Sequence, residues 1–535
     1  MKKNVRHNIF LGSSIFVTGK FSGLFLQFFS GLLIIRYLPR EEYGLFALSY
    51  TIINIAVVLA NLGLNNGLPR MIPNYLAKKQ FHQARQAIYT TIILICTSSM
   101  LLLTAVYFSS PMLSQIFSNK DMPDVLQKLC FLIPALALSK GLASVFRGVK
   151  KVFPQSFFID FLPSLLRLPG YLIVIYLGLG LMGFISAQLM AVYISCTGFI
   201  LYTILNLNRS FPHVCSTSSP GEDYHSPIPP EMPPPQQHQP ARAVSRELIL
   251  FSLPLMGIFI IDMLTNWSTT LLLGYYKTPM AVAALNALNR LLSLIPLPLH
   301  ATVFMFLPIA TQYIGNRKLD ELSRLYIRIT KWISLFTLPL AMILILDGEF
   351  VLHLLFKGKY DDLRTELIIL VLGTIFHTLM GPNATTLLAG GKIRIILINT
   401  FINVAICGTL SVLIIPIFSV AGAALAISIS LIIGNSLNSF FVYKKYSIHP
   451  IKIENILPIS FSIMISIVIF YVSDLFIDNS ILMKIFLYLN VFVLFIISPF
   501  VTKSIQDEEK DFFQSSIEKI IKNKKTQSWI MKTLL

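Results

Sequence analysis

The sequence predicts an all-α integral membrane protein with about 14 transmembrane helices. Three observations predict it: the composition, the number of long apolar runs and the distribution of basic residues. Of the 535 residues, 55% are hydrophobic and 13% are charged, whereas soluble domains carry about 25% charged residues. The mean hydropathy is +0.71. These values exclude a water-soluble globular protein, a disordered chain and a disulfide-stapled scaffold.

The apolar runs give the number of helices. A helix that crosses a bilayer needs roughly 20 apolar residues, and fourteen runs of about this length follow one another along the chain. We expect helices near 9–36, 43–65, 87–108, 125–146, 155–177, 181–207, 247–273, 280–312, 326–346, 365–390, 395–416, 419–443, 454–473 and 481–502.

The basic residues support this number of spans. The net charge is +18, with 43 Lys and Arg against 25 Asp and Glu. If the N-terminus lies in the cytoplasm, about 30 basic residues fall in inner segments and 8 in outer segments. Basic residues collect in cytoplasmic loops, and one missing helix would invert every later loop. We therefore expect a multi-pass protein of the cell membrane with both termini in the cytoplasm.

A Pro-rich segment divides the chain. Residues 209–244 are polar and contain Pro-Ile-Pro-Pro-Glu-Met-Pro-Pro-Pro, which predicts a flexible or polyproline-like linker on the cytoplasmic side. We favour a spacer over a recognition motif for it. The expected organisation is an N-terminal six-helix lobe at 1–208, the linker at 209–244, a C-terminal six-helix lobe at 245–446, an extra helix pair at 447–503 and an amphipathic tail at 504–535.

The two lobes look like copies of one unit. Short motifs recur at offsets of 239, 242 and 239 residues: Leu68-Pro69 with Leu307-Pro308, Gly148 with Gly390, and Gly183 with Gly422. Six helices is an even number, so both copies enter the membrane in the same direction. We expect a pseudo-two-fold axis along the membrane normal, as in other transporters with parallel repeats.

Several kinds of chemistry are excluded. The five cysteines are scattered singly, so neither disulfides nor a zinc site is expected. No P-loop, dinucleotide-binding glycine motif or catalytic triad spacing occurs, and the outer loops are too short to form a catalytic domain. We expect no enzyme activity, no cofactor, no metal and no nucleic acid partner.

Five segments resemble the polysaccharide transporter branch of the multidrug/oligosaccharidyl-lipid/polysaccharide exporter superfamily. Their order and spacing carry the resemblance over roughly residues 1–500. The segments are Tyr37-Leu-Pro-Arg-Glu-Glu-Tyr-Gly44, Gly63-Leu-Asn-Asn-Gly-Leu-Pro-Arg70, Phe251-Ser-Leu-Pro-Leu, Gly381-Pro-Asn-Ala-Thr-Thr-Leu-Leu-Ala-Gly390-Gly-Lys and Ile415-Pro-Ile-Phe-Ser-Val-Ala-Gly422-Ala-Ala. The sequence departs from the family pattern at Val282-Ala283-Ala284 and in its long linker.

The resemblance implies a flippase for a lipid-linked oligosaccharide. Such proteins form a V of two six-helix lobes around a central cavity. They carry an isoprenoid-diphosphate-linked glycan from the inner to the outer leaflet by alternating access, for surface polysaccharide biosynthesis. The implied partners are the lipid-linked oligosaccharide, membrane lipids and a glycan polymerase or glycosyltransferases.

Basic residues inside the spans are the candidates for diphosphate binding. An unpaired charge in hydrocarbon costs several kcal/mol or more, so such residues face a wet cavity or a partner. Lys20 and Arg290 are the chief candidates, because both lie near the middle of apolar stretches. Lys140 is a further cavity candidate. Arg36 at the outer mouth and Arg70 at the inner end are weaker candidates. The alternative for Arg36 is that its side chain only reaches out to the membrane surface, and the alternative for Arg70 is that it only marks a cytoplasmic loop.

Few acidic residues accompany these cations. Asp160 and Asp262 are the acids within spans, and Asp262 shares a helix face with Asn266 one turn away. We expect this pair to serve as counter-ion or coupling site, with polar packing between helices as an equal alternative. Arg167 lies before Pro169 and is expected to bond carbonyls freed by that proline, and Lys484 is expected at the interface.

Two other functions stay open from the sequence. A cation-coupled multidrug exporter of the same superfamily would need intramembrane carboxylates, which are scarce here. A non-transport membrane scaffold would recruit glycan enzymes through the Pro-rich linker.

Overall fold

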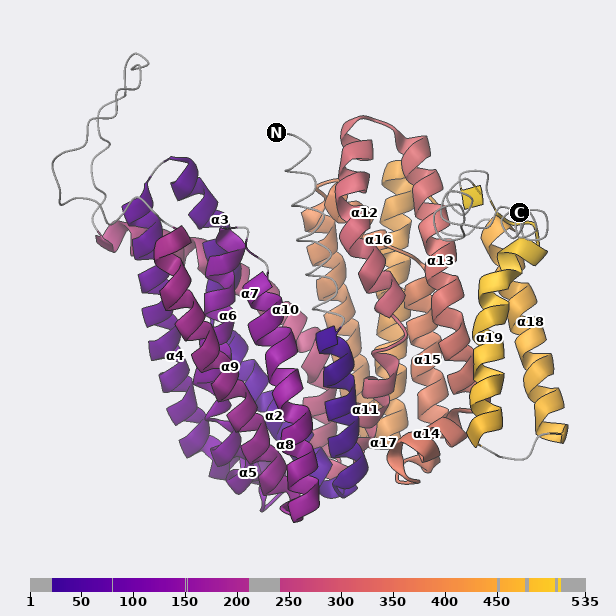
Figure 1. Ribbon diagram of the computed structural model, residues 1–535, viewed down its shortest axis with the longest axis horizontal. Coiled ribbons are helices and arrows are strands. Elements are labelled where there is room, and N and C mark those ends of the chain that lie inside the picture. The colour runs from indigo at the N-terminus through magenta and orange to yellow at the C-terminus, as the bar shows by residue number, and fades with distance from the viewer. Residues whose placement is uncertain are drawn as a thin grey trace, which may run out of the picture. The chain divides into compact units, whose positions relative to one another are not determined.

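The computed structural model describes residues 22–78, 80–149, 151, 153–210, 241–449, 453–476, 481–505 and 509–510. Within these ranges every regular element is a helix, which confirms the all-α class (Figure 1). Ten of the described helices are long and apolar enough to cross a membrane. Helices α11 (Pro279–Leu292) and α12 (Leu297–Gly315) meet at a bend of 55°, and they form an eleventh span if the pair counts as one. Fourteen spans therefore remain a prediction.

The chain folds into two compact units, Met1–Ala283 and Ala284–Leu535. The first contains the helix Ser22–Tyr37, α2 (Arg40–Ala60), α3 (Leu64–Ala77), α4 (Phe81–Ile116), α5 (Met122–Leu129), α6 (Leu132–Gly148), α7 (Phe153–Gln155), the π-helix η1 (Ser156–Phe161), α8 (Leu162–Leu177), α9 (Gly180–Ser210) and α10 (Ala241–Tyr276). The second contains α12 (Leu297–Gly315), α13 (Leu319–Leu346), α14 (Gly348–Phe356), the 3-10 helix η2 (Asp361–Leu363), α15 (Arg364–Leu379), α16 (Asn383–Ala389), α17 (Ile393–Tyr446), α18 (Ile453–Phe476) and α19 (Ile481–Val501). The boundary between the units falls within α11.

A glycine breaks the second span of the first unit. Gly63 joins α2 to α3 in the left-handed conformation, with φ of 73°, which glycine adopts without steric cost. A Cβ atom at Gly63 would lie 2.2 Å from the carbonyl oxygen of Ser252 in α10. The motif that begins at Gly63 therefore marks the turn where α10 crosses the break.

Helix α10 packs within the first unit. It contacts α2, α3 and α4, and the hydroxyl of Tyr75 in α3 donates a hydrogen bond of 3.2 Å to the carboxylate of Glu247. The predicted second lobe begins at residue 245, so the compact units and the predicted repeat divide the chain at different points.

At two of the three paired motifs, the copy in the first half and the copy in the second half have similar local structure. Pro69 lies in α3 and Pro308 in α12, and each of these helices follows a break in its span. Gly148 is the last residue of α6, and Gly390 directly follows the last residue of α16. These correspondences fit an internal repeat, and the symmetry axis itself remains a prediction.

Helix α17 covers two of the predicted spans. Its 54 residues are interrupted at Ser419, whose φ of 52° is not helical, three residues after Pro416. A Cβ atom at Gly422 would lie 2.7 Å from the carbonyl oxygen of Ile414. The kink thus brings the two parts of α17 too close for a side chain at this position.

The extra helix pair packs on α13. Figure 1 shows α18 and α19 side by side next to α13, and all three are in contact. Val491 and Phe495 of α19 are buried against Leu335, Leu338 and Met342 of α13. Two ion pairs reinforce this packing. Lys484 of α19 pairs with Asp347 at 2.9 Å. Lys331 of α13 pairs with Glu509, and the two side chains are 1% and 3% exposed.

The first prediction concerns Gly44 in α2. A Cβ atom at Gly44 would lie 1.7 Å from the carbonyl oxygen of Pro279, so Gly44→Ala must push two backbones apart. Overpacking of this kind costs about 1–3 kcal/mol. We expect a lower melting temperature of the purified protein in detergent. Gly257→Ala is the matched control, because nothing lies within 4 Å of its Cβ position; equal melting temperatures for the two variants would contradict the close approach.

The second prediction concerns Glu509. Glu509→Gln leaves the buried ammonium of Lys331 without its counter-charge, and breaking a buried pair this way costs about 3–5 kcal/mol. We expect a clear loss of thermal stability. Glu321→Gln is the control, because its pair with Lys318 is exposed and such pairs contribute about 0–1 kcal/mol. If the two variants have the same melting temperature, the buried pair between Lys331 and Glu509 does not stabilise the structure.

Candidate functional site

Three of the predicted site residues have side chains outside the described part of the chain. Lys20 lies before residue 22, where the description begins. Asp262 and Asn266 lie one turn apart on α10, and the structure describes only their backbone. The roles predicted for these three residues therefore stay proposals.

The predicted cations Arg36, Arg70 and Arg290 lie on three different elements. Arg36 is in the last turn of the helix Ser22–Tyr37, is half-buried and has an interaction partner. Arg70 is exposed on α3. Arg290 is half-buried in the last turn of α11. No described contact joins them, so their binding roles also stay proposals.

Lys140 lines a small cavity inside the first unit. The cavity has a volume of about 50 Å³ and lies between α2, α6, α9 and the η1–α8 segment. Its polar lining consists of Tyr50, Ser139, Lys140, Arg167, Gln188 and Ser195. Lys140 is eight residues from the end of α6, which is about 12 Å along a helix. This places a basic side chain beside a cavity at depth within a membrane-spanning helix.

Arg167 brings a second basic side chain to the same cavity. Its Nε donates a hydrogen bond of 3.1 Å to the carbonyl oxygen of Pro163, one turn earlier in α8. The sequence predicted a carbonyl freed by Pro169, which is that of Leu165. The acceptor is a different carbonyl, and one bond from Nε leaves the other guanidinium N–H groups of Arg167 available.

A π-helix shapes the wall that faces these cations. η1 inserts a wider turn at Ser156–Phe161, and two of its residues, Phe158 and Ile159, line the cavity. π-helical turns inside α-helices are rare and often occur at functional sites. The turn rotates the residues that follow it, including Arg167 of α8, relative to a regular helix.

The lining is rich in donors and poor in acceptors. None of the described residues that line the cavity is acidic, and Lys140 has no described partner. Asp160 lies next to the lining residue Ile159 in η1 and has an interaction of its own. The buried hydroxyl of Ser195 also lacks a hydrogen-bond partner. The side-chain carbonyl of Gln188 already accepts a bond of 2.8 Å from Tyr171. An anion is the ligand that satisfies such a set of groups.

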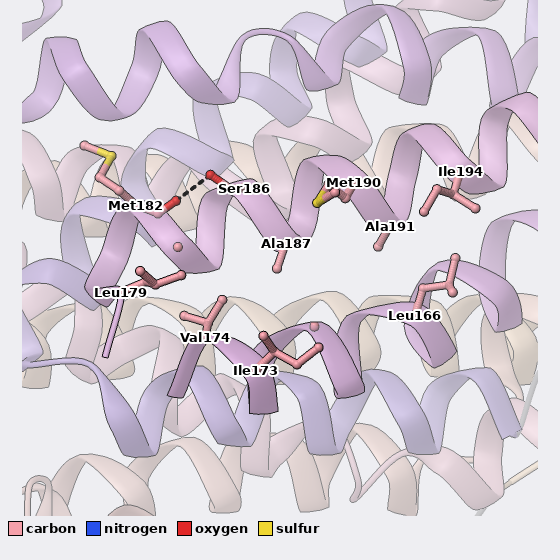
Figure 2. Close-up of a pocket in the computed structure, with 12 residues that line it drawn as sticks. Leu166, Ile173, Val174, Leu179, Met182, Ser186, Ala187, Met190, Ala191 and Ile194 are labelled. Atoms are coloured by element: carbon pink, nitrogen blue, oxygen red, sulfur yellow. Dashed lines mark hydrogen bonds between the residues drawn. The ribbon is translucent and has the colours of Figure 1, made fainter. Parts of the chain in front are cut away.

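Helices α8 and α9, which contribute to the cavity, also form an apolar groove with other residues. Figure 2 shows it between α8 and α9, with Ile173, Val174, Met190 and Ile194 along its walls and a volume of about 490 Å³. The hydroxyl of Ser186 in this groove donates to a carbonyl of its own helix. The groove therefore offers hydrocarbon surface and suits a lipid chain better than a sugar.

Other basic residues of the chain have structural partners. Lys331 and Lys484 pair with carboxylates, as described above, so Lys484 is tied to Asp347 where the sequence predicted an interfacial position. Arg147 at the end of α6 donates a bond of 2.9 Å to the carbonyl oxygen of Asn65. That carbonyl lies four residues before Pro69, which has no N–H to donate to it. Arg147 thus replaces a missing helix hydrogen bond.

Sequence reasoning missed most of the polar lining. Arg167 was assigned a local role, and Tyr50, Gln188 and Ser195 were not considered. Gln188 carries one usable signal, since it is a polar residue with a large amide in the apolar run of α9. Tyr50 and Ser195 carry none, because such residues are common in membrane helices.

Two family models match the chain. The polysaccharide biosynthesis protein family matches residues 9–314, and the MatE family matches residues 254–414. No curated protein matches the sequence.

Solved structures share the fold at low sequence identity. A structure described as the lipid II flippase MurJ in an inward closed conformation has a TM-score of 0.67 and 15% identity, over 90% of this chain and 97% of that one. An inward-facing multidrug resistance MATE family transporter has a TM-score of 0.60 and 16% identity, over 80% and 94%. A superfamily transporter from Pyrococcus furiosus, whose title notes a binding pocket of reverse polarity, has a TM-score of 0.51 and 16% identity, over 82% and 95%.

The third prediction concerns Arg147. Arg147→Met removes the donor to the Asn65 carbonyl and leaves that carbonyl unpaired, at a cost of about 1–3 kcal/mol. We expect a lower melting temperature. Arg70→Met on the exposed face of α3 is the control and should melt like the wild type. A wild-type melting temperature for Arg147→Met would show that water replaces the bond.

Proposed function

The chain belongs to the polysaccharide biosynthesis protein family, and from this premise we propose that it is a flippase for an isoprenoid-diphosphate-linked oligosaccharide. The family model covers more than half of the chain, and the resemblance found in the sequence motifs is thereby confirmed. The proposed activity moves the glycan across the cytoplasmic membrane by alternating access, for surface polysaccharide biosynthesis.

The cavity in the first unit is the observation that carries this proposal. Lys140 and Arg167 both line this cavity, and no acidic residue is among its described lining residues. Basic residues without carboxylate partners are costly inside a membrane and mark the path of an ion or substrate. A diphosphate supplies the missing negative charge, whereas a cationic drug would be repelled.

The remaining predicted cations complete the proposed binding set. Lys20 and Arg290 bind the diphosphate chiefly, with Lys140, Arg36 and Arg70 as further contacts along the path. Asp262 and Asn266 serve as counter-ion or coupling group. The proposed role of these positive charges is to attract a headgroup that cannot cross hydrocarbon alone, while the lipid chain stays in the bilayer.

The structural relatives support a transporter. The MurJ structure is described as a lipid II flippase, and the fold it shares extends over 90% of this chain. From the distribution of the basic residues we propose that this protein lies in the cell membrane with both termini in the cytoplasm. A glycan polymerase or glycosyltransferases are the proposed partners, since they would consume or supply the glycan.

A cation-coupled multidrug exporter is the second candidate. The MatE family match at residues 254–414 and the inward-facing multidrug resistance MATE family transporter favour it. Such coupling needs carboxylates inside the spans, and the cavity of the first unit presents basic groups instead. Drug resistance on expression that is abolished by Asp262→Asn would favour this second function over the flippase.

The fourth prediction tests the flippase. Labelled lipid-linked glycan is reconstituted with the protein in proteoliposomes, and the accessibility of its headgroup to an outside reagent is followed with time. We expect the Lys20→Ala/Arg290→Ala variant to flip about tenfold more slowly or worse, since each lost charged hydrogen bond is worth roughly 1.5–3 kcal/mol.

Lys120→Ala is the matched control for this assay, because Lys120 is an exposed basic residue outside the helices that carry the proposed set. It should flip at the wild-type rate. Equal rates for all three proteins would remove Lys20 and Arg290 from the mechanism, and no flipping by the wild type would contradict the proposed function itself.

A further inference from the structure

We propose that the cavity between α2, α6, α8 and α9 is a binding site for a single phosphoryl-type oxyanion, held by Lys140 and Arg167. The inference rests on the proposed function and deepens it: it narrows the ligand of this cavity to one phosphoryl group and adds Gln188, Ser195 and Tyr50 to Lys140 and Arg167 as its ligands. All of these residues lie in the first unit.

The size of the cavity sets the size of the ligand. About 10–15 Å³ of water-accessible volume holds one water molecule, so about 50 Å³ holds a few waters. A tetrahedral oxyanion occupies a similar space, and a disaccharide does not fit. The cavity therefore accommodates a phosphoryl group and excludes the glycan attached to it.

The charge of the lining sets the sign of the ligand. Lys140 has no described partner, and Arg167 uses one of its N–H groups on the Pro163 carbonyl. Two positive side chains around one cavity repel each other in a medium of low dielectric constant. An anion between them replaces this repulsion with two attractions, which gives the basic pair a physical reason to be there.

Neutral donors complete the coordination. Ser195 is 2% exposed, and its hydroxyl has no hydrogen-bond partner. The carbonyl of Gln188 is occupied by Tyr171, which leaves the amide NH₂ group as its donor. Together with the Tyr50 hydroxyl, these groups provide hydrogen bonds to several oxygens of one tetrahedral anion. Hydrogen bonds to a charged acceptor are shorter and stronger than neutral ones.

The binding partner can come from two sources with the same chemistry. One is free inorganic phosphate, and the other is the phosphate of a lipid headgroup. The apolar groove of Figure 2 lies on neighbouring positions of α8 and α9, where Leu166 precedes Arg167 and Ala187 precedes Gln188. A chain in the groove and a phosphate in the cavity would therefore contact the same two helices at the same level.

The experiment measures anion binding to the full-length protein in detergent, without transport. Inorganic phosphate and geranylgeranyl monophosphate are titrated separately by calorimetry, with chloride at equal ionic strength and geranylgeraniol as blanks. We expect at least one of the two phosphates to bind and both blanks to fail. Binding of inorganic phosphate identifies a free-anion site, and binding of the prenyl phosphate alone identifies a lipid headgroup site.

Variants connect the binding to this cavity. The Lys140→Met/Arg167→Met double variant should bind the phosphate about tenfold more weakly or not at all. Lys140→Arg keeps the charge and should retain binding, and Lys120→Met should bind like the wild type. If the double variant does not fold, Ser195→Val, which removes one hydroxyl, should weaken binding while Lys140→Arg still binds.

Two results would overturn the proposal: neither phosphate binds the wild type, or the variants that lose cavity donors bind as tightly as the wild type. Either result would remove the first-unit cavity as support for the flippase, but flipping itself is measured independently by the proteoliposome assay with the wild type and the Lys20→Ala/Arg290→Ala variant. Loss of flipping with intact phosphate binding would contradict the proposed function and leave this site standing.

Discussion

The cost of an unpaired charge in hydrocarbon is the constraint on which the structure of this protein depends. Each basic residue within the spans must meet a carboxylate, a carbonyl or a hydrated space. Lys331 and Lys484 meet carboxylates and hold α19 and the chain after it to α13. Arg147 meets a carbonyl that Pro69 leaves without a donor. Lys140 has neither a carboxylate nor a carbonyl partner among the described residues, and its side chain lines a cavity.

These solutions separate the cations that hold helices together from the cations that remain available to a ligand. A basic residue that is paired and dry stabilises the contact between two helices, because removing its partner leaves a buried charge. A basic residue beside a cavity, without a carboxylate, attracts an anion instead. The same residue types thus serve two purposes in one chain, and the partner found in the structure decides which purpose applies.

Breaks in the helices place these residues. Gly63 allows α3 to leave the axis of α2 beneath α10, and the π-helix η1 resets the direction of the side chains on α8. Pro69 in α3 removes one further helix hydrogen bond, and Arg147 replaces it. Irregular backbone of this kind is tolerated within a membrane only where the protein or water satisfies it.

The sequence predicted the helical class and the presence of basic residues at depth, because apolar runs of about 20 residues and single charges within them are local signals. For this reason it predicted that Lys140 faces a transport cavity; the cavity that Lys140 lines lies within the first unit, and its role in transport remains a proposal. It did not reveal the partner of Lys331, since Glu509 lies 178 positions later and the contact forms only when α19 packs on α13. It also misplaced the bond of Arg167, because the sequence does not show which of the nearby carbonyls in α8 the guanidinium reaches.

The most direct measurement is a cryo-electron microscopy map of the protein in nanodiscs with a short-chain isoprenyl diphosphate glycan. The account predicts phosphate density within about 3 Å of a basic side chain of the proposed set, with the glycan outside the small cavity of the first unit. A bound headgroup whose phosphates contact no lysine or arginine, or whose binding surface is lined by acidic residues, would contradict it.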